Sequence, residues 1–182
     1  MWKGLLAAML MAGATASAAQ SPVEGPLFDP VGGYRITQYR GVVGDAPADV
    51  MRIDTAEARR LWRRGAILID VNPAPGAVRD PQTGVWTLAE PHQTIPGAHW
   101  FAESGRGVLP ADIETWFLSG VRRLAEAHPH RPVIIFCQAD CWMSWNAALR
   151  LRRARVRNIR WFADGLDGWR DVALPTVSAR PE

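Results

Sequence analysis

Cysteine is scarce in this sequence: Cys137 and Cys141 are the only two in 182 residues. A framework of several disulfides is therefore excluded. A bridge between such near neighbours would close a very small loop, which restricts the unfolded chain far less than a long loop does. The Cys-x-x-Cys-His pattern of a c-type haem site is also absent. We therefore predict that the two cysteines serve chemistry and do not staple the fold.

Charge of one sign is not in large excess, and lysine is almost missing. The sequence holds 21 Lys and Arg residues against 18 Asp and Glu residues, a net charge of +3, and Lys3 is its single lysine. So small a net charge argues against dedicated nucleic-acid binding. Arginines gather between residues 150 and 160, which predicts a solvated helix face; attraction of an anion or an acidic partner is the alternative.

Long apolar runs are missing everywhere except near the N-terminus. Lys3 precedes an apolar stretch over residues 5–16, which ends in small residues. This order is typical of a secretory signal peptide, predicted over residues 1–18 with cleavage after Ala18 or Ala19. The stretch is short for a bilayer span, and an uncleaved anchor is the alternative. We expect a periplasmic protein with no membrane contact after cleavage.

The rest of the chain divides into three parts. Residues 19–49 are predicted to form an N-terminal extension without a core of its own, residues 50–176 a domain, and residues 177–182 a C-terminal tail. In the domain, strands are predicted at 50–54, 66–71, 98–101, 132–136 and 157–162, and helices at 56–64, 110–127, 142–153 and after 164–169. This alternation predicts an α/β fold with a central parallel sheet of about five strands and helices on both faces.

Local signals mark three boundaries. Thr55 is the predicted N-cap of the first helix, and Gly65 is predicted to end it. The long connection 72–94 is predicted to be a loop with a small hairpin at Gly84.

Three segments, taken in order, resemble the rhodanese family. They read ILIDV at 67–71, IPGAHW at 95–100, and a block from VIIFC at 133–137 to NIRWFADGLDGW at 158–169. The segment CQADCWMSWNAA at 137–148 is similar to one subfamily, the CXXCW-motif proteins associated with pyrroloquinoline quinone (PQQ)-dependent catabolism. The element from Leu27 to Tyr34 fits that subfamily too.

The resemblance implies a rhodanese-like sulfurtransferase in which Cys137 carries a persulfide. The subfamily implies sulfur-relay or thiol chemistry that serves a PQQ-dependent alcohol or aldehyde oxidation system. It also implies a periplasmic quinoprotein dehydrogenase or a sulfur carrier as the partner. PQQ would belong to that partner enzyme, and no cofactor is expected on this chain.

The reactive loop is predicted to lie between a buried strand and a helix. The strand ends at Cys137, and the helix begins within about five residues, so backbone N–H groups should point towards the sulfur and favour its thiolate. Loop residues Gln138, Ala139, Asp140, Trp142 and Met143 are expected to shape the site. Cys137 is expected to be a better nucleophile than Cys141, which follows Asp140 and lies where the helix has begun. A buried core thiol is the alternative for Cys137.

The loop departs from the family pattern in its charge. Catalytic rhodanese loops resemble Cys-x4-Arg or Cys-x4-Lys, whereas Trp142 stands at that position here and no basic residue occurs before Arg150. Asp140 would also repel an anion. The sequence therefore disfavours ordinary thiosulfate:cyanide sulfur transfer, unless an arginine remote in sequence substitutes.

Cys141 opens further possibilities. It can resolve a persulfide on Cys137 or form a reducible disulfide with it, which would make the protein a thiol–disulfide oxidoreductase. A third hypothesis is a non-catalytic binding module that uses Trp142 and Trp145 for protein contact. Metal binding by the cysteines with His128 or His130 is disfavoured, and no metal site is predicted.

Two more side chains are candidates for a supporting role. Asp70 ends a buried strand and can either hydrogen-bond near the site or hold a loop in place. His99 is expected to be structural, and Gly165 and Gly168 are expected to permit a tight turn.

Overall fold

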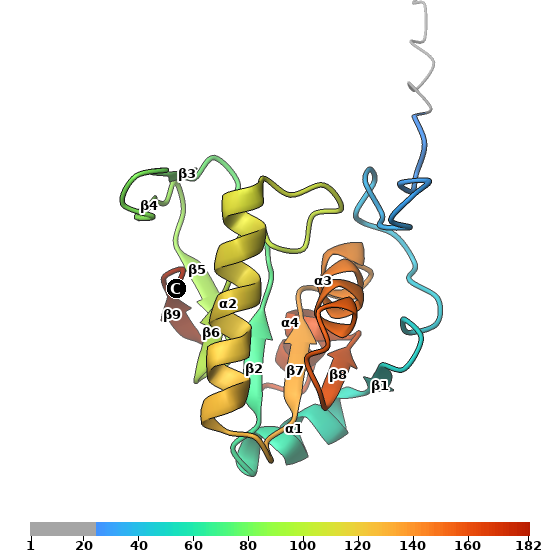
Figure 1. The fold of residues 1–182 in the computed structure, drawn as a ribbon. Coiled ribbons are helices and arrows are strands. Elements are labelled where there is room, and N and C mark those ends of the chain that lie inside the picture. Colours follow the sequence, from blue (N-terminus) through green and yellow to red (C-terminus); the bar gives the residue numbers. More distant parts are fainter. Residues whose placement is uncertain (1–24) are drawn as a thin grey trace, which may run out of the picture.

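The computed structural model describes residues 25–182, and its centre is a five-stranded sheet (Figure 1). The strands are β1 (Met51–Ile53), β2 (Ile67–Asp70), β6 (Ala98–Trp100), β7 (Val133–Phe136) and β8 (Ile159–Phe162), in the order β1-β8-β7-β2-β6. Every neighbouring pair is parallel. The predicted α/β fold with a central parallel sheet is therefore confirmed. The predicted signal peptide, residues 1–18, lies outside the described residues.

Helices cover both faces of the sheet, as predicted. Helices α2 (Ala111–Ala127) and α3 (Trp142–Arg153) pack on one face, and α1 (Thr55–Arg63) and α4 (Gly165–Asp171) pack on the other. All four residues of β2 and of β7 are buried, which explains their unbroken apolar sequences. Because the strands are parallel, their carboxyl ends meet at one edge, where sites of α/β proteins lie.

Two small antiparallel pairs stand beside the main sheet. The predicted hairpin near Gly84 is present as β3 (Val78–Arg79) paired with β4 (Trp86–Thr87). A pair that was not predicted joins β5 (His92–Thr94) to β9 (Val177–Ala179). The last residues are therefore held against the domain, although the sequence suggested a tail, because a three-residue strand gives no local signal of its distant partner.

The first helix begins one residue earlier than predicted. Asp54 is the N-cap, and its carboxylate accepts a hydrogen bond from the Glu57 N–H at 2.8 Å. The Thr55 hydroxyl instead donates to Asp164, 3.2 Å away. Gly65 follows the helix with a φ of 78°, as its predicted role requires.

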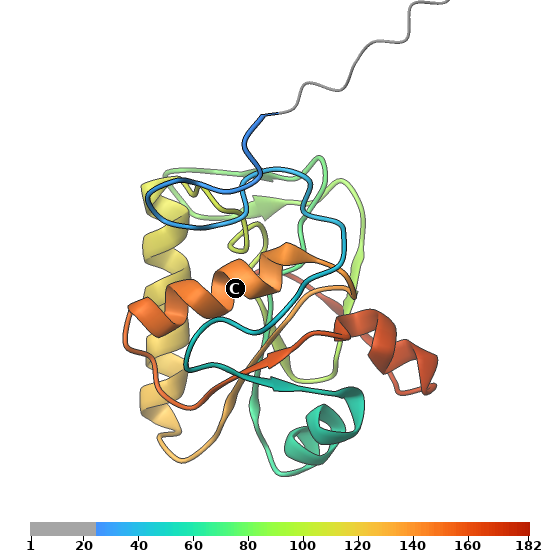
Figure 2. The same ribbon diagram turned by 90° about the vertical axis from the view of Figure 1, so that its right-hand side faces the viewer.

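The part of the N-terminal extension that is described, residues 25–49, has no helix or strand and wraps around the start of α3 (Figure 2). It passes the N-terminal end of α3 before it returns to β1. Main-chain pairing between Arg40 and Cys141 attaches it to the reactive loop, and Val43 is buried in the same core as both cysteines. No helix in the described part of the chain is long and apolar enough to cross a membrane.

One arginine of the basic cluster is not on a solvated face. The Arg150 side chain is buried and donates to the carbonyl oxygens of Ser104, Arg106 and Gly107, and its Nε lies 3.0 Å from a Glu114 carboxylate oxygen. The prediction of a solvated face is therefore wrong for Arg150, which closes the 104–107 turn onto α3.

Candidate active site

Cys137 lies at the carboxyl edge of the sheet, directly after β7, and a tight turn leads from it into α3. Asp140 takes a positive φ of 46° in this turn, and Cys141 is the N-cap residue of the helix. The strand-loop-helix arrangement around Cys137 is thus as predicted. The turn is also tied to α4, because the Leu166 N–H donates to the Cys137 carbonyl oxygen at 2.7 Å, and the Ala139 N–H donates to Asp167 at 3.1 Å.

Gly165 is required for this close approach. It has a φ of 56°, and a Cβ added to it would lie 2.4 Å from the Cys137 carbonyl oxygen. Any side chain here would push α4 away from the reactive turn. The glycine therefore sets the position of the turn from the opposite face of the sheet.

The Cys137 thiol is completely buried, with no exposed area. Its Sγ accepts a hydrogen bond from the Ser144 N–H at 3.3 Å and lies 3.4 Å from the Cys141 carbonyl oxygen. The first of these contacts is the N–H cradle that the sequence predicted. Burial nevertheless raises the pKa of Cys137 well above its ordinary value, and the neighbouring Cys141 raises it further. Cys137 is therefore a protonated thiol at neutral pH.

Cys141 has the opposite electrostatics. Its pKa is lowered to about 7, chiefly because the Cys137 thiol can donate a hydrogen bond to a Cys141 thiolate. The N–H groups of Met143 and Gln138 and the charge of Arg40 lower the pKa further, against the effect of burial. Cys141 is 4% exposed. The directions of the two pKa shifts favour a thiolate on Cys141, whereas the sequence favoured one on Cys137.

The helix boundary is a second cause of the lowered pKa of Cys141, after the hydrogen bond from Cys137. Since α3 begins at Trp142, Cys141 precedes the helix and its side chain lies beside N–H groups that have no partner within the helix. The positive end of the helix dipole lies at the same place. Asp140, which was expected to oppose a thiolate, is exposed, and solvent weakens its charge.

Arg40 supplies a cation that the loop itself lacks. Main-chain hydrogen bonds from Trp142 N–H to Tyr39 O and from Gly41 N–H to Asp140 O, both 2.8 Å, hold Arg40 beside Cys141. Its guanidinium donates to the Gln138 side-chain oxygen at 2.9 Å. The sequence allowed for a remote arginine but did not locate it, because about 100 residues separate Arg40 from the loop.

Trp142 and Trp145 lie in the first turn of α3, are partly buried, and pack against the N-terminal segment. Trp142 packs edge-on against Phe28 at 5.2 Å between ring centroids, with Trp145 on its other side at 5.4 Å. The Trp145 Nε1 donates to the Asp45 carbonyl oxygen at 2.9 Å. Met143 is buried in the core. These contacts give Trp142 and Trp145 a packing role, and part of each side chain remains exposed.

Asp70 lies in a separate polar cluster at the end of β2. Its buried carboxylate accepts hydrogen bonds from the Asn72 N–H at 2.8 Å, the Asn72 side-chain amide at 2.9 Å, and the Thr94 hydroxyl at 2.5 Å. The His92 Nε2 lies 2.8 Å from its second oxygen. Asp70 therefore ties both ends of the 72–94 connection to the sheet, which was one of the two roles considered for it.

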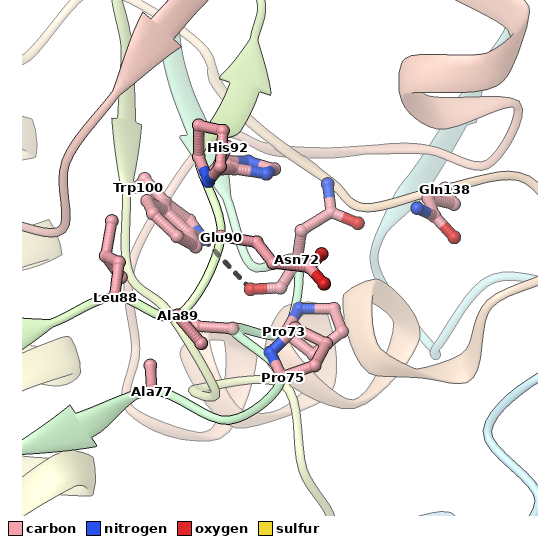
Figure 3. Close-up of a pocket in the computed structure, with 12 residues that line it drawn as sticks. Asn72, Pro73, Pro75, Ala77, Leu88, Ala89, Glu90, His92, Trp100 and Gln138 are labelled. Carbon is pink, nitrogen blue, oxygen red and sulfur yellow. Dashed lines mark hydrogen bonds between the residues drawn. The ribbon is translucent and has the colours of Figure 1, made fainter.

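A cavity of about 210 Å³ opens next to this cluster (Figure 3). Its walls include Asn72, Glu90, His92 and Trp100, and Gln138 of the reactive turn lies on its far side. Sequence reasoning missed Asn72 and His92, because neither stands in a recognisable motif. The cavity and the cysteine pair lie at the same edge of the sheet. Gln138 is the polar residue, among those described, that borders both of them.

The other histidines lie away from both places. His99 is paired with Glu182, 2.7 Å away, which agrees with the structural role expected for it. Within residues 25–182 no group of three His, Cys, Asp or Glu side chains is placed to hold a metal ion.

No protein-family model matches this chain, and no curated protein sequence matches it either. A solved structure similar to it is that of a full-length protein from Lactobacillus plantarum, with 17% identity and a TM-score of 0.44 over 71% of this chain and 88% of the other. Another is the 30 kDa polysulfide-sulfur transferase homodimer from Wolinella succinogenes, with 19% identity and a TM-score of 0.41 over 71% and 80%. Likenesses this distant identify no function for this chain.

Proposed function

We propose that this protein is a rhodanese-like sulfur-relay protein whose reacting unit is the pair Cys141 and Cys137. The observation that carries the proposal is the position of two adjacent cysteines in the turn between β7 and α3, at the carboxyl edge of the sheet, with the Cys137 Sγ 3.4 Å from the Cys141 carbonyl oxygen. A pKa of about 7 on Cys141 leaves a large fraction of it as thiolate at neutral pH, and the thiolate is the form that attacks sulfur. The motif resemblance of the chain to the rhodanese family supports the same assignment.

The first step is attack by the Cys141 thiolate on the outer sulfur of a persulfide donor. A bond forms between the two sulfurs, the sulfur–sulfur bond of the donor breaks, and its electron pair leaves with the donor as a thiolate. Cys141 then carries a persulfide, and nothing is oxidised or reduced overall. An acceptor thiolate can take the outer sulfur in the same way and restore the Cys141 thiolate.

The positive charge of Arg40 and the N–H groups of the turn stabilise the anionic forms in this cycle. They face Cys141 before the attack and the persulfide afterwards, because a Cys141 persulfide is itself an acid that is anionic near neutral pH. Since Cys141 is only 4% exposed, the donor gains access only when the pairing at Tyr39–Gly41 loosens. The N-terminal segment thus both completes the site and covers it.

A thiol–disulfide oxidoreductase is the second candidate, and the proximity of the two thiols favours it. In this reaction the Cys137 sulfur attacks the Cys141 sulfur of the persulfide, a disulfide forms, and hydrogen sulfide leaves with the proton of Cys137. A dithiol reductant must then restore the two thiols.

The finer assignment concerns the setting of the reaction. The segment CQADCWMSWNAA supports a role beside a PQQ-dependent alcohol or aldehyde oxidation system in the periplasm, with a quinoprotein dehydrogenase or a sulfur carrier as the partner. PQQ would be bound by that enzyme and not by this chain. N-terminal sequencing of the exported protein should find Ala19 or Gln20 at its start; a product that begins at Met1 would rule out the predicted signal cleavage.

The test of the central proposal is the intact mass of the reduced protein after exposure to glutathione persulfide. Relay chemistry predicts a gain of about 32 Da that acceptor thiol removes, whereas a loss of about 2 Da indicates the disulfide of the second candidate. An unchanged mass overturns both candidates and favours the non-catalytic binding module.

A further inference from the structure

The cavity beside Asp70 is lined by one buried hydrogen-bond acceptor that has no partner within residues 25–182, the side-chain oxygen of Asn72. Asn72 is 2% exposed, and its side-chain oxygen has no hydrogen-bond partner among the described residues. A buried polar group without a partner is costly, so such a group marks a place where something binds. In Figure 3 this oxygen points into the space between Asn72 and Gln138.

The orientation of the Asn72 amide is dictated by Asp70. The amide nitrogen donates to the Asp70 carboxylate at 2.9 Å, and turning the amide over would set its oxygen against that negative charge. Asp70 is itself held by Thr94 and His92, so it cannot turn away. The acceptor of Asn72 is therefore fixed in direction before any ligand arrives.

Two of the nitrogens near the cavity already have partners, and the Gln138 side-chain amide supplies a donor on its far side. The Trp100 Nε1 donates to the Asn72 main-chain oxygen at 2.9 Å, and the His92 Nε2 is bound to Asp70. Glu90 extends its carboxylate over the same opening (Figure 3), and among the described residues no lysine or arginine lines the cavity. A ligand that suits these walls brings hydrogen-bond donors and a positive charge.

The remaining walls limit the size and shape of the ligand. Pro73, Ala74, Pro75 and Leu88 are apolar, as is the face of Trp100. A cavity of about 210 Å³ is smaller than the pockets that hold drug-sized molecules, which start at about 300 Å³. It suits a short aliphatic chain that ends in an ammonium group.

We propose that this cavity is a binding site for small aliphatic primary amines in their ammonium form, with Asn72 and Glu90 as the recognising acceptors. The ammonium donates to the Asn72 side-chain oxygen and to the Glu90 carboxylate, and its alkyl chain packs on Pro73 and Trp100. This site is independent of the sulfur chemistry proposed above, since it needs neither Cys137 nor Cys141.

The test is a titration of the full exported chain with ethylammonium chloride, followed by shifts of backbone and tryptophan indole NMR signals. Ethanol and acetate serve as neutral and anionic probes of similar size. The site predicts saturable shifts for Asn72, Glu90 and the Trp100 indole with ethylammonium alone. Equal shifts with ethanol, or no saturable shifts with any probe, overturn the proposal and leave the cavity to water.

Two variants and a control make the test specific. Glu90→Gln should weaken ethylammonium binding about three- to tenfold, because it removes a partly exposed charge partner. Asn72→Ala should weaken it about tenfold or more, with thermal unfolding recorded to show that the variant is folded. Glu126→Gln on α2 removes the same charge away from the cavity and should leave binding unchanged; a loss equal to that of Glu90→Gln would overturn the assignment. Binding should persist in Cys141→Ser, whatever becomes of the sulfur chemistry.

Discussion

The β7–α3 turn and the β2–β5 connection leave the same edge of the sheet and have opposite polarity. At the turn, N–H groups and the Arg40 guanidinium of the N-terminal segment lower the pKa of Cys141, whereas the connection places the Asn72 oxygen and the Glu90 carboxylate at a cavity. Helix α3 follows β7 closely, and the N–H groups of its first turn have no partner within the helix. Strand β2 ends at Asp70, and a long loop follows it. The Asp70 carboxylate accepts hydrogen bonds from the donors of Asn72 and Thr94. The segment that follows each of these two strands thus contributes to the polarity at the end of that strand, together with groups such as Arg40 that come from elsewhere in the chain.

Removal of the thiolate should abolish the anionic chemistry of the first region. Cys141→Ser should lower the rate of sulfur acceptance from glutathione persulfide by at least about a hundredfold, because a serine hydroxyl is not ionised near neutral pH. Cys137→Ser should still accept sulfur but should form no disulfide. Peptide mapping of the labelled protein measures both. Acceptance that survives in Cys141→Ser and fails in Cys137→Ser would restore Cys137 as the nucleophile.

The polar cluster of the other region can be disrupted at its centre. Asp70→Asn should destabilise the protein by about 2–4 kcal/mol, because the new amide nitrogen opposes donors that are buried with it. The urea midpoint of unfolding measures the change.

A surface carboxylate provides the control for this substitution. Asp112→Asn loses an exposed ion pair with Arg79 and should change stability by less than about 1 kcal/mol. Equal losses in the two variants would show that Asp70 is not the anchor of the 72–94 connection.

Removal of the cation should reduce the difference in polarity between the two regions. Arg40→Gln raises the pKa of Cys141 from about 7 towards its ordinary value of 9.0, since the charge of Arg40 is one cause that lowers it. Alkylation of Cys141 at pH 7 should slow about two- to fivefold and recover above pH 9. Arg59→Gln on the exposed side of α1 is the matched control. A rate that stays low at every pH would indicate lost structure and not a lost charge.

A weaker effect is expected on stability as a function of pH. The pKa of Cys141 is lower in the folded protein than in the unfolded chain, so its ionisation contributes stability that is full above about pH 9 and is lost as the pH falls through about 7. The raised pKa of Cys137 acts in the opposite direction at alkaline pH. Urea unfolding at pH 6 and pH 8 should show a slope with pH that Cys141→Ser reduces. An unchanged slope contradicts the low pKa.

The features that could be predicted from the sequence are those set by neighbours along the chain. The apolar runs before Asp70 and Cys137 identified buried parallel strands, and the helix that starts at Trp142 was located correctly. Contacts across a long separation were not predictable. The contact of Arg40 with Gln138 and the pairing of β5 with β9 join segments that are far apart in the sequence. Neither segment carries a sequence motif that identifies its partner.

The directions of the two cysteine pKa shifts could not be predicted from the sequence for a related reason. The sequence shows that Cys137 follows a buried strand and that Cys141 precedes a helix, but the consequence depends on how deeply each sulfur is buried. Burial outweighs the Ser144 N–H at Cys137, whereas at Cys141 the hydrogen bond from the Cys137 thiol, aided by N–H groups and Arg40, outweighs burial. That balance arises from the packing of residues 39–43, far away in the sequence.

The docking of the N-terminal segment on α3 bears on how the protein folds. Arg35 exchanges hydrogen bonds with Asn146, 111 residues further along the chain, and Trp145 binds Asp45 across 100 residues. Contacts of such long sequence separation form late, because the entropic cost of closing a large loop must be met before the contacts can stabilise the chain. During synthesis, the N-terminal segment leaves the ribosome long before helix α3, on which it packs. We therefore expect a newly made chain to pass through a stage in which Cys141 is not yet covered by the N-terminal segment, and this stage ends when that segment docks on α3.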